Sequence, residues 1–312
     1  MTAQVWIDQT RDMLLSGYVE DLDLVTTPPS PATTGTTLVI QGISSSIVKG
    51  VVIEVNSELM YVISVTSTTV SVMRGYGGST PGTHTAGDVV RVSPKFPAHR
   101  IIQSINDDLA DLSAPSQGLF QMKTTSFTYN ASVDGYDLSG LTSAEIDSIY
   151  SVTYADAGSA ASEPEVSSWR LRRNRDTSSF SSGLALILYS GVWPGQTVTV
   201  SYKAPFTSIT NAATARSATG LAATAYDLPP LGAAMALMTT TPIRREFLDA
   251  QGTSRMADEV PPGAISASFR DLMGRRRARV EAESGRLVSQ YPQVWTRSSG
   301  MRPSNQWSGY SS

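Results

Sequence analysis

The chain has 312 residues, a length that indicates about two domains, each with its own hydrophobic core. Cysteine is absent and there are two histidines, which excludes disulfides and a cysteine nucleophile and leaves few residues for a zinc site. Charged residues form 16% of the chain and the formal net charge is -3, a low charge content that indicates a surface partly covered by partners.

The sequence shows no sign of export or membrane insertion. It begins without the basic and apolar regions of a secretory signal. No apolar run approaches the ~20 residues that are needed to cross a bilayer. These features predict a soluble, assembled protein with no membrane partner.

The first predicted element is a helix over residues 5–25, which contain no proline. From Leu14 to Val25 the apolar residues climb by four, four and three positions, as on one face of a helix. Three prolines between residues 26 and 37 then prevent the helix from continuing. The chain is therefore expected to change direction here.

In residues 38–92 the apolar residues no longer follow the spacing of a helix. They form short Val- and Ile-rich runs separated by Gly, Asn-Ser and Ser-Thr, which is typical of consecutive antiparallel strands. The Gly-rich loop at 74–82 does not match a phosphate-binding loop, because it lacks Gly-Lys-Ser/Thr and Pro81 and strand-like sequence follow. We interpret it as a connection between two strands of a small β module.

A second helix is predicted over residues 98–112, after Pro97, because proline is favoured at a helix start. From Ile101 its apolar residues again climb by four, four and three positions. The matching stripes predict that the two helices pair as a hairpin that the β module interrupts. His99 lies outside the stripe and is expected on the exposed face of the helix.

A second β domain is predicted over residues 120–202. It contains five β-rich runs with turns such as Asp134-Gly135 between them, and its size is that of a sandwich. From Trp169 to Arg173 apolar and arginine residues alternate, so one face of that strand is expected to be lined by arginine.

The last third of the chain is predicted to be helical and ends in a basic segment. Residues 210–256 are Ala-rich, and a last helix is expected over 268–290 with an arginine cluster in its middle. Eight arginines against three acidic residues between positions 270 and 302 give a local surplus of +5, so the rest of the chain carries -8. The segment after this helix is expected to be an extended arm that docks its tryptophans on a neighbour.

The sequence carries no recognisable catalytic motif. It has no Gly-x-Ser-x-Gly elbow, and no serine belongs to a recognisable His/Asp motif. Asp107 and Asp108 are interpreted as the solvated face of a helix, and Asp134 and Asp137 as turn residues. We predict no catalytic residue, no cofactor and no metal site.

The arginine clusters at 170–175 and 275–279 have two interpretations. Guanidinium groups suit phosphate, so both clusters could touch nucleic acid. Against this, lysine is scarce, no nucleic-acid-binding motif is present and the body is acidic. We favour pairing of these arginines with carboxylates across subunit interfaces.

Three runs in the β module carry a resemblance to known proteins. They are Gly-Val-Val-Ile-Glu-Val at 50–55, Ser-Glu-Leu-Met-Tyr-Val at 57–62, and Val-Met-Arg-Gly-Tyr-Gly-Gly-Ser-Thr at 72–80, which His84-Thr85-Ala86-Gly87 follows. They resemble a module in neck and tail proteins of tailed-bacteriophage virions. The flanking helices, with Arg-Asp-Met-Leu-Leu at 11–15 and Ile-Asn-Asp-Asp-Leu at 105–109, look like the helical core of head-to-tail adaptor (connector) proteins.

This resemblance covers about the first 115 residues and implies a structural virion protein that is not an enzyme. Such a protein would assemble in the host cytoplasm as a twelve-subunit ring in the neck, bound to the portal protein and to a tail or nozzle protein. The ring would surround the DNA channel, where an acidic body lets packaged DNA slide past. A tail-tip, collar or fibre-attachment protein that binds partner proteins or a host glycan is the second hypothesis, and a glycan hydrolase is the third.

The predicted fold class is α+β: a helical hairpin or bundle core interrupted by a small β-barrel-like module, followed by a β-sandwich-like domain, further helices and an extended C-terminal arm. The expected domains are a helical core at 1–27 and 94–115, the inserted β module at 28–93, the sandwich-like domain at 116–207, Ala-rich helices at 208–260, and the basic helix and arm at 261–312. The predicted interface residues come from the two helices, the basic helix and the arm: Leu14, Tyr18, Leu22, Ile101, Ile105, Leu109, Arg275, Arg276, Arg277, Arg279, Trp295 and Trp307.

Overall fold

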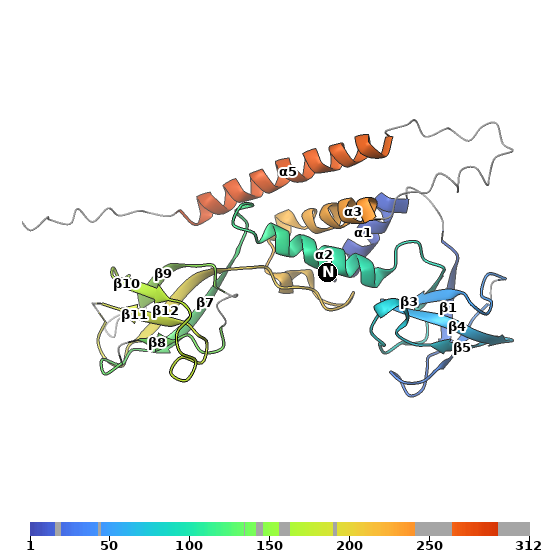
Figure 1. The fold of residues 1–312 in the computed structure, drawn as a ribbon, viewed down its shortest axis with the longest axis horizontal. Helices are drawn as coiled ribbons and strands as arrows, with labels where there is room; N and C mark the ends of the chain where they lie inside the picture. Colours follow the sequence, from blue (N-terminus) through green and yellow to red (C-terminus); the bar gives the residue numbers. More distant parts are fainter. Residues whose placement is uncertain are drawn as a thin grey trace, which may run out of the picture.

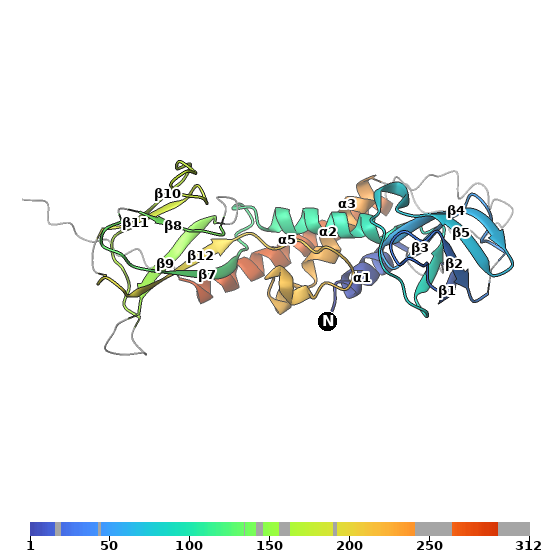
Figure 2. The ribbon, with the colours of Figure 1, turned by 90° about the horizontal axis from the view of Figure 1, so that it is seen from below.

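Two β domains lie at opposite ends of a layer of helices (Figure 1). The computed structural model describes residues 1–15, 20–42, 45–133, 135–141, 146–155, 163–189, 192–240 and 264–292. A view turned by 90° also places the helices between the β domains, so the molecule is elongated (Figure 2). The helices of the described residues are α1 (Gln4–Leu15), α2 (Ala98–Leu112), α3 (Leu228–Thr240) and α5 (Ala264–Gln290), with short 3-10 helices η1 (Tyr76–Gly78), η2 (Arg216–Thr219) and η3 (Ala223–Ala225).

The first β domain is a closed antiparallel barrel with the strand order β1-β2-β5-β4-β3-β6. It closes because β6 pairs with β1 on one side and with β3 on the other. Side chains alternate along the strands: Val70 and Val72 of β5 lie in the barrel core, while Thr69 and Met73 are exposed. The strands are β1 (Leu22–Thr27), β2 (Thr37–Ile40), β3 (Val52–Val55), β4 (Glu58–Thr66), β5 (Thr69–Met73) and β6 (Val89–Val92).

One buried carboxylate holds the Gly-rich loop between β5 and β6. Glu58 accepts hydrogen bonds of 2.6 and 2.7 Å from the Arg74 guanidinium, and Nε2 of His84 lies 2.8 Å from it. Glu58 also accepts the backbone N–H groups of Gly75 and Gly82. Burial alone would raise the pKa of Glu58, but these bonds lower it to about 2. The loop is therefore an integral part of the barrel.

The second β domain packs two antiparallel sheets of three strands, with the orders β10-β11-β8 and β7-β12-β9. Along β12, Val198, Val200 and Tyr202 are buried at alternate positions. They share one hydrophobic core with Leu186 of β11 in the other sheet. The strands are β7 (Gln121–Thr128), β8 (Tyr136–Asp137), β9 (Ser148–Tyr154), β10 (Trp169–Arg172), β11 (Ala185–Leu188) and β12 (Thr197–Ala204).

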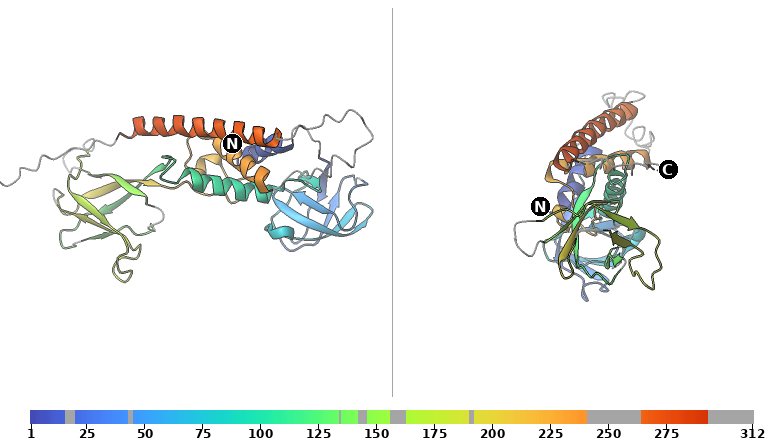
Figure 3. Two further views of the ribbon diagram at one scale, coloured as in Figure 1. Left: turned by 45° about the horizontal axis from the view of Figure 1, so that its top comes forward. Right: turned by 90° about the vertical axis from the view of Figure 1, so that its left-hand side faces the viewer.

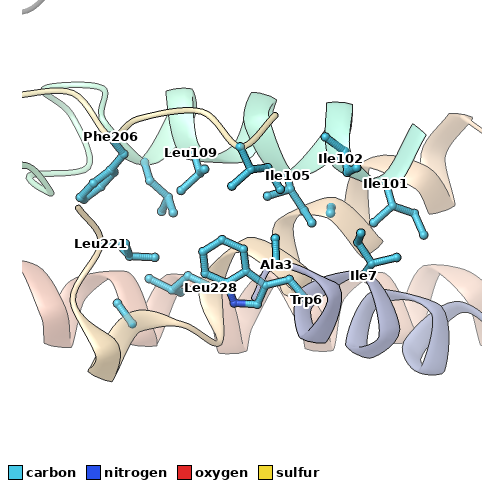
Figure 4. Close-up of a cluster of buried hydrophobic side chains, with 14 of the residues drawn as sticks. Ala3, Trp6, Ile7, Ile101, Ile102, Ile105, Leu109, Phe206, Leu221 and Leu228 are labelled. Carbon is cyan, nitrogen blue, oxygen red and sulfur yellow. The ribbon is translucent and has the colours of Figure 1, made fainter. Parts of the chain in front are cut away.

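The helical layer has a third hydrophobic core, to which α1, α2 and the segment before α3 contribute (Figure 4). Trp6 and Ile7 of α1 and Ile105 of α2 are fully buried there. The indole N–H of Trp6 donates to the carbonyl of Tyr226 at 2.7 Å, which satisfies its one polar group. Leu287 of α5 belongs to the same core. Segments from both ends of the sequence therefore meet in this layer.

A second buried carboxylate joins the barrel to the helices. Glu54 of β3 forms an ion pair with Arg11 of α1 and accepts the N–H of Ala98, at the start of α2, at 2.7 Å. The two charged side chains are 1% and 5% exposed. Removal of one partner would leave the other charge buried and unpaired, so the pair fixes the barrel against the helices.

The predicted helical hairpin or bundle core is wrong, although the chain does mix α and β structure. Most elements of the described residues are strands, twelve against four α-helices, and the first part of the chain folds into a closed barrel. The first helix covers Gln4–Leu15, and residues 22–25 of the predicted helix lie instead in strand β1. The spacing that predicted one helix spans two elements, because Leu14 packs on the helical core whereas Val25 is buried in the barrel. Helix α2 covers the predicted residues but packs mainly against α3.

Candidate assembly interface

Helix α5 carries the basic cluster and lies across the helical layer (Figure 3). It runs from the barrel side to the sandwich side, where Tyr291, just after its end, packs against Phe120 and Tyr150. From residue 269 on, where its side chains are described, the buried ones are Val280, Glu283 and Leu287. The docked face of α5 therefore combines apolar and polar contacts.

Arg276 makes the central contact between α5 and α2. Its Nε and Nη2 donate to Oδ1 of Asp108 at 3.1 and 2.7 Å, and Nη2 also donates to Oδ2 of Asp111 at 2.7 Å. The two aspartates are three positions apart on α2 and therefore share one face of it. One guanidinium thus binds two carboxylates of the same helix.

Asp108 is enclosed by three helices. Its side chain is 6% exposed, and a Cβ on Gly232 of α3 would lie 1.7 Å from Oδ1 of Asp108, so α3 needs a glycine at this position. Burial raises the pKa of Asp108 to about 7, although Arg276 opposes this rise. Among the described residues Oδ2 has no hydrogen-bond partner. The site therefore disfavours a charged carboxylate, and Arg276 offsets part of that penalty.

A second set of polar contacts lies near the start of α3. Nε of Arg279 donates to Asp227 at 2.7 Å, and its Nη2 donates to the carbonyl of Thr224 at 2.6 Å. Glu283 accepts hydrogen bonds from the Thr224 hydroxyl at 3.0 Å and from Nε of Arg286 at 2.7 Å. The Arg279–Asp227 pair is partly exposed, and such pairs contribute at most about 1 kcal/mol because solvent and salt screen them.

The other side of α5 meets solvent. Arg275 is exposed and pairs at 2.9 Å with Asp271, one turn earlier on the same helix. Arg277, Met273 and Val288 are also exposed, although Met273 and Arg277 border the hollow between α5 and the turn at Ser116 and Gln117. The helix therefore has one face on its own chain and one face, both basic and apolar, that is available to a partner.

Two hollows lie along the docked side of α5. The larger, about 460 Å³, lies between the helix and the turn at Ser116 and Gln117, with Met235 of α3 in its wall. The smaller, about 130 Å³, is lined by Leu119 and Leu287 among others. These hollows mean that α5 does not pack closely along its whole length.

The structure places the predicted interface residues in different environments. Ile101, Ile105 and Leu109 are buried in the core of their own chain, and Leu14 packs against that core. Leu22 is exposed on strand β1 of the barrel. The arginines lie on α5, where Arg276 and Arg279 contact their own chain and Arg275 and Arg277 are exposed. Tyr18, Trp295 and Trp307 lie outside the described residues.

Sequence reasoning misses the acidic partners of α5. Asp108 is not on a solvated face, because α5 covers it. A signal was present: Asp108 and Asp111 lie three positions apart on a helix, and an arginine cluster occurs elsewhere in the chain. Nothing local connects the two features, since Asp108 and Arg276 are 168 positions apart. Only the fold brings them together.

His99 and Asp137 hold structural positions. His99, predicted on an exposed face, is half-buried with both ring nitrogens shielded from solvent, and burial lowers its pKa. Asp137 accepts hydrogen bonds from Ser181 and Ser182, which lower its pKa although burial opposes this, so it orders a turn. Asp134 lies outside the described residues.

The second arginine cluster begins on β10, an edge strand of the sandwich, and continues into the segment after it. Arg170 and Arg172 are exposed at alternate positions and therefore share one face of the strand, as the sequence predicts. Arg173 donates to the carbonyl of Asp147 at 2.9 Å, and Arg175 lies 5.9 Å from the ring centre of Phe180. This end of the molecule therefore presents a basic strand to solvent.

Membrane-spanning and metal-binding features were sought in the described part of the chain. No helix there has both the length and the hydrophobicity to cross a membrane. The same residues include no group of three or more His, Asp or Glu side chains placed to hold a metal ion.

No protein-family model matches the chain, and no curated protein matches it in sequence.

Proposed function

We propose that this chain is a structural protein of a tailed-bacteriophage virion, a head-to-tail adaptor that forms a ring between portal and tail around the DNA channel. The supporting observation is that two β domains, each with its own core, lie at opposite ends of the helical layer (Figure 1). A connector must touch two different partners at once, and this arrangement offers two separate surfaces. The buried pair of Glu54 and Arg11 keeps the barrel in a fixed position relative to the helices.

The residues that carry the resemblance also support the proposal. Glu58, Arg74 and His84 come from separate runs of the motif and meet in one buried network. These residues order the barrel loop, so the role of the motif in this chain is architectural. An architectural motif suits a protein whose task is assembly.

Binding to portal-bearing capsids tests the proposal. Tailless capsids of the same phage, with and without portal, are incubated with the full-length chain and separated by sedimentation. The bound copies are then counted by mass measurement of the particles. We expect twelve copies on each capsid with a portal and none on capsids without one. Failure to bind the portal-bearing capsids would contradict the proposal.

One observation favours a second candidate, a tail-tip, collar or fibre-attachment protein. The sandwich domain exposes 56% of Tyr189 and 75% of Trp193. Exposed aromatic rings suit stacking on sugars or insertion into a protein partner. The same count of copies separates the candidates, because three or six copies per particle would favour the second.

A further inference from the structure

We infer that α5 is exchanged between copies of this chain, so that in the assembly α5 of one copy occupies the groove formed by α2, α3 and the turn at 116–118 on the next copy. The inference rests on the proposed function and deepens it, because it names the contact that links neighbours in the ring. The occupant to which it commits is therefore the α5 of a second copy.

The first argument is the small apolar contact of α5. Helix α2 buries seven of its 15 residues, Asp108 among them. Helix α5 has 27 residues, and from residue 269 on it buries two apolar side chains, Val280 and Leu287. Because the hydrophobic effect scales with buried apolar area, α5 is held to the body far less firmly, residue for residue, than α2. The hollow of about 460 Å³ beneath it agrees with this.

The second argument is charge complementarity. Arg276 and Arg279 of α5 meet Asp108, Asp111 and Asp227 of the body. All of these bonds form again when α5 of one copy replaces α5 of another, so the exchange loses no contact. In a ring the groove of the next copy lies near each α5. The effective concentration of that groove is therefore high, which favours binding between copies.

The number of residues between α3 and α5 also allows the exchange. In the sequence, 23 residues separate Thr240, where α3 ends, from Ala264, where α5 begins. A chain of that length spans up to about 75 Å when extended. This is roughly twice the ~40 Å length of a 27-residue helix. The connection is therefore long enough to carry α5 to a neighbour.

The absence of cysteine permits a direct test by disulfide formation. A Cβ on Gly118 would lie 3.6 Å from Cβ of Ser284 on α5, within the range of a disulfide. Two full-length chains with tags of different size are co-expressed, one with Gly118→Cys and the other with Ser284→Cys, and the assembled protein is oxidised. We expect a covalent heterodimer on a non-reducing gel, because these two cysteines lie on different copies.

Two matched controls define the contact. In the first, Gly285→Cys replaces Ser284→Cys. No atom lies within 4 Å of a Cβ at position 285, so we expect at least about tenfold less heterodimer. In the second, Arg276→Glu on the Ser284→Cys chain should lower the yield several-fold, because it opposes Asp108 and Asp111. Arg275→Glu should leave the yield unchanged, since Arg275 pairs within α5.

A heterodimer yield no higher than that of the Gly285→Cys control overturns the inference, whether or not a chain with both cysteines closes its own disulfide. The copy count keeps the two proposals apart. A twelve-copy ring without heterodimer overturns the exchange and supports the proposed function. Heterodimer in particles that do not hold twelve copies supports the exchange and contradicts the proposed twelve-copy ring.

Discussion

At Asp108 a carboxyl group, a guanidinium and a glycine from three helices occupy one small volume. Gly232 leaves space for the carboxyl group, and Arg276 supplies the charge that faces it. Because the side chain is buried, desolvation raises its pKa to about 7 in spite of Arg276. The contact between α2 and α5 is therefore expected to respond to pH in the neutral range.

Asp108→Asn should change how stability depends on pH. The pKa of Asp108 rises from 3.8 to about 7 on folding, so the folded chain keeps a proton that the unfolded chain releases. This group therefore stabilises the fold at low pH, and its contribution disappears as the pH rises from about 4 through 7. Urea unfolding measures the effect. From pH 5 to pH 8 the free energy of unfolding of the wild type should fall by on the order of 2–4 kcal/mol more than that of Asp108→Asn.

The control for this prediction is Asp176→Asn, which removes an exposed carboxylate whose hydrogen bonds from Ser178 lower its pKa. That carboxylate is ionised at both pH 5 and pH 8, so the difference from wild type should be about the same at both pH values. If Asp108→Asn behaves in the same way, the buried carboxyl group does not titrate in the neutral range and our account of it is wrong.

Among the elements, Gly232 of α3 and Gly274 of α5 both lie within helices, but their surroundings differ. Gly232→Ala should destabilise the protein by about 2–3 kcal/mol, because its Cβ would overlap the Asp108 carboxylate. Gly274→Ala in α5 should stabilise it by about 0.5–1 kcal/mol, because nothing lies within 4 Å of its Cβ and alanine is the better helix former. Chemical denaturation of both variants measures the two effects.

A further substitution tests the cause of the Gly232→Ala effect. Asp108→Ala removes the atoms that the new methyl group would meet. The double variant should therefore be destabilised by clearly less than the sum of the two single changes. Additive effects would show that the clash is not the cause.

The sequence predicts elements well where one period holds from end to end. Helix α2 covers the residues predicted from Pro97 and from its apolar stripe, and β5 follows a simple alternation. Strand β1 was missed because Val25 is its one buried residue, so the strand shows no alternating pattern. Its apolar residues continued the helical spacing that begins in α1, and they were therefore assigned to the helix. Its identity comes from its pairing with β2 and with β6, and β6 is distant in sequence.

The candidate site was predictable in part for a similar reason. The arginine cluster of α5 is visible in the sequence, but the choice of Arg276 over Arg275 as the contact to α2 depends on the orientation of the helix against the body. That orientation is set by long-range packing, which a single sequence does not encode in any local pattern. The same reason hid Asp227 as a partner of Arg279.

On the scale of the whole molecule, three separate hydrophobic cores predict unfolding in more than one step. Val72→Ala in the barrel and Val200→Ala in the sandwich remove the same atoms from fully buried sites. Each should lower one calorimetric transition by several degrees and leave the other nearly unchanged. A single transition that both variants shift equally would contradict this.

The distribution of the three cores along the chain also sets an order of folding during synthesis. The barrel uses residues 22–92 alone, so it is complete soon after it leaves the ribosome. The core of the helical layer joins Trp6 to Leu228 and Leu237 of α3, so it closes only after α3 has been made. Until then Trp6 and Ile101 lack part of their packing, and the nascent chain presents an apolar surface on which chaperones act.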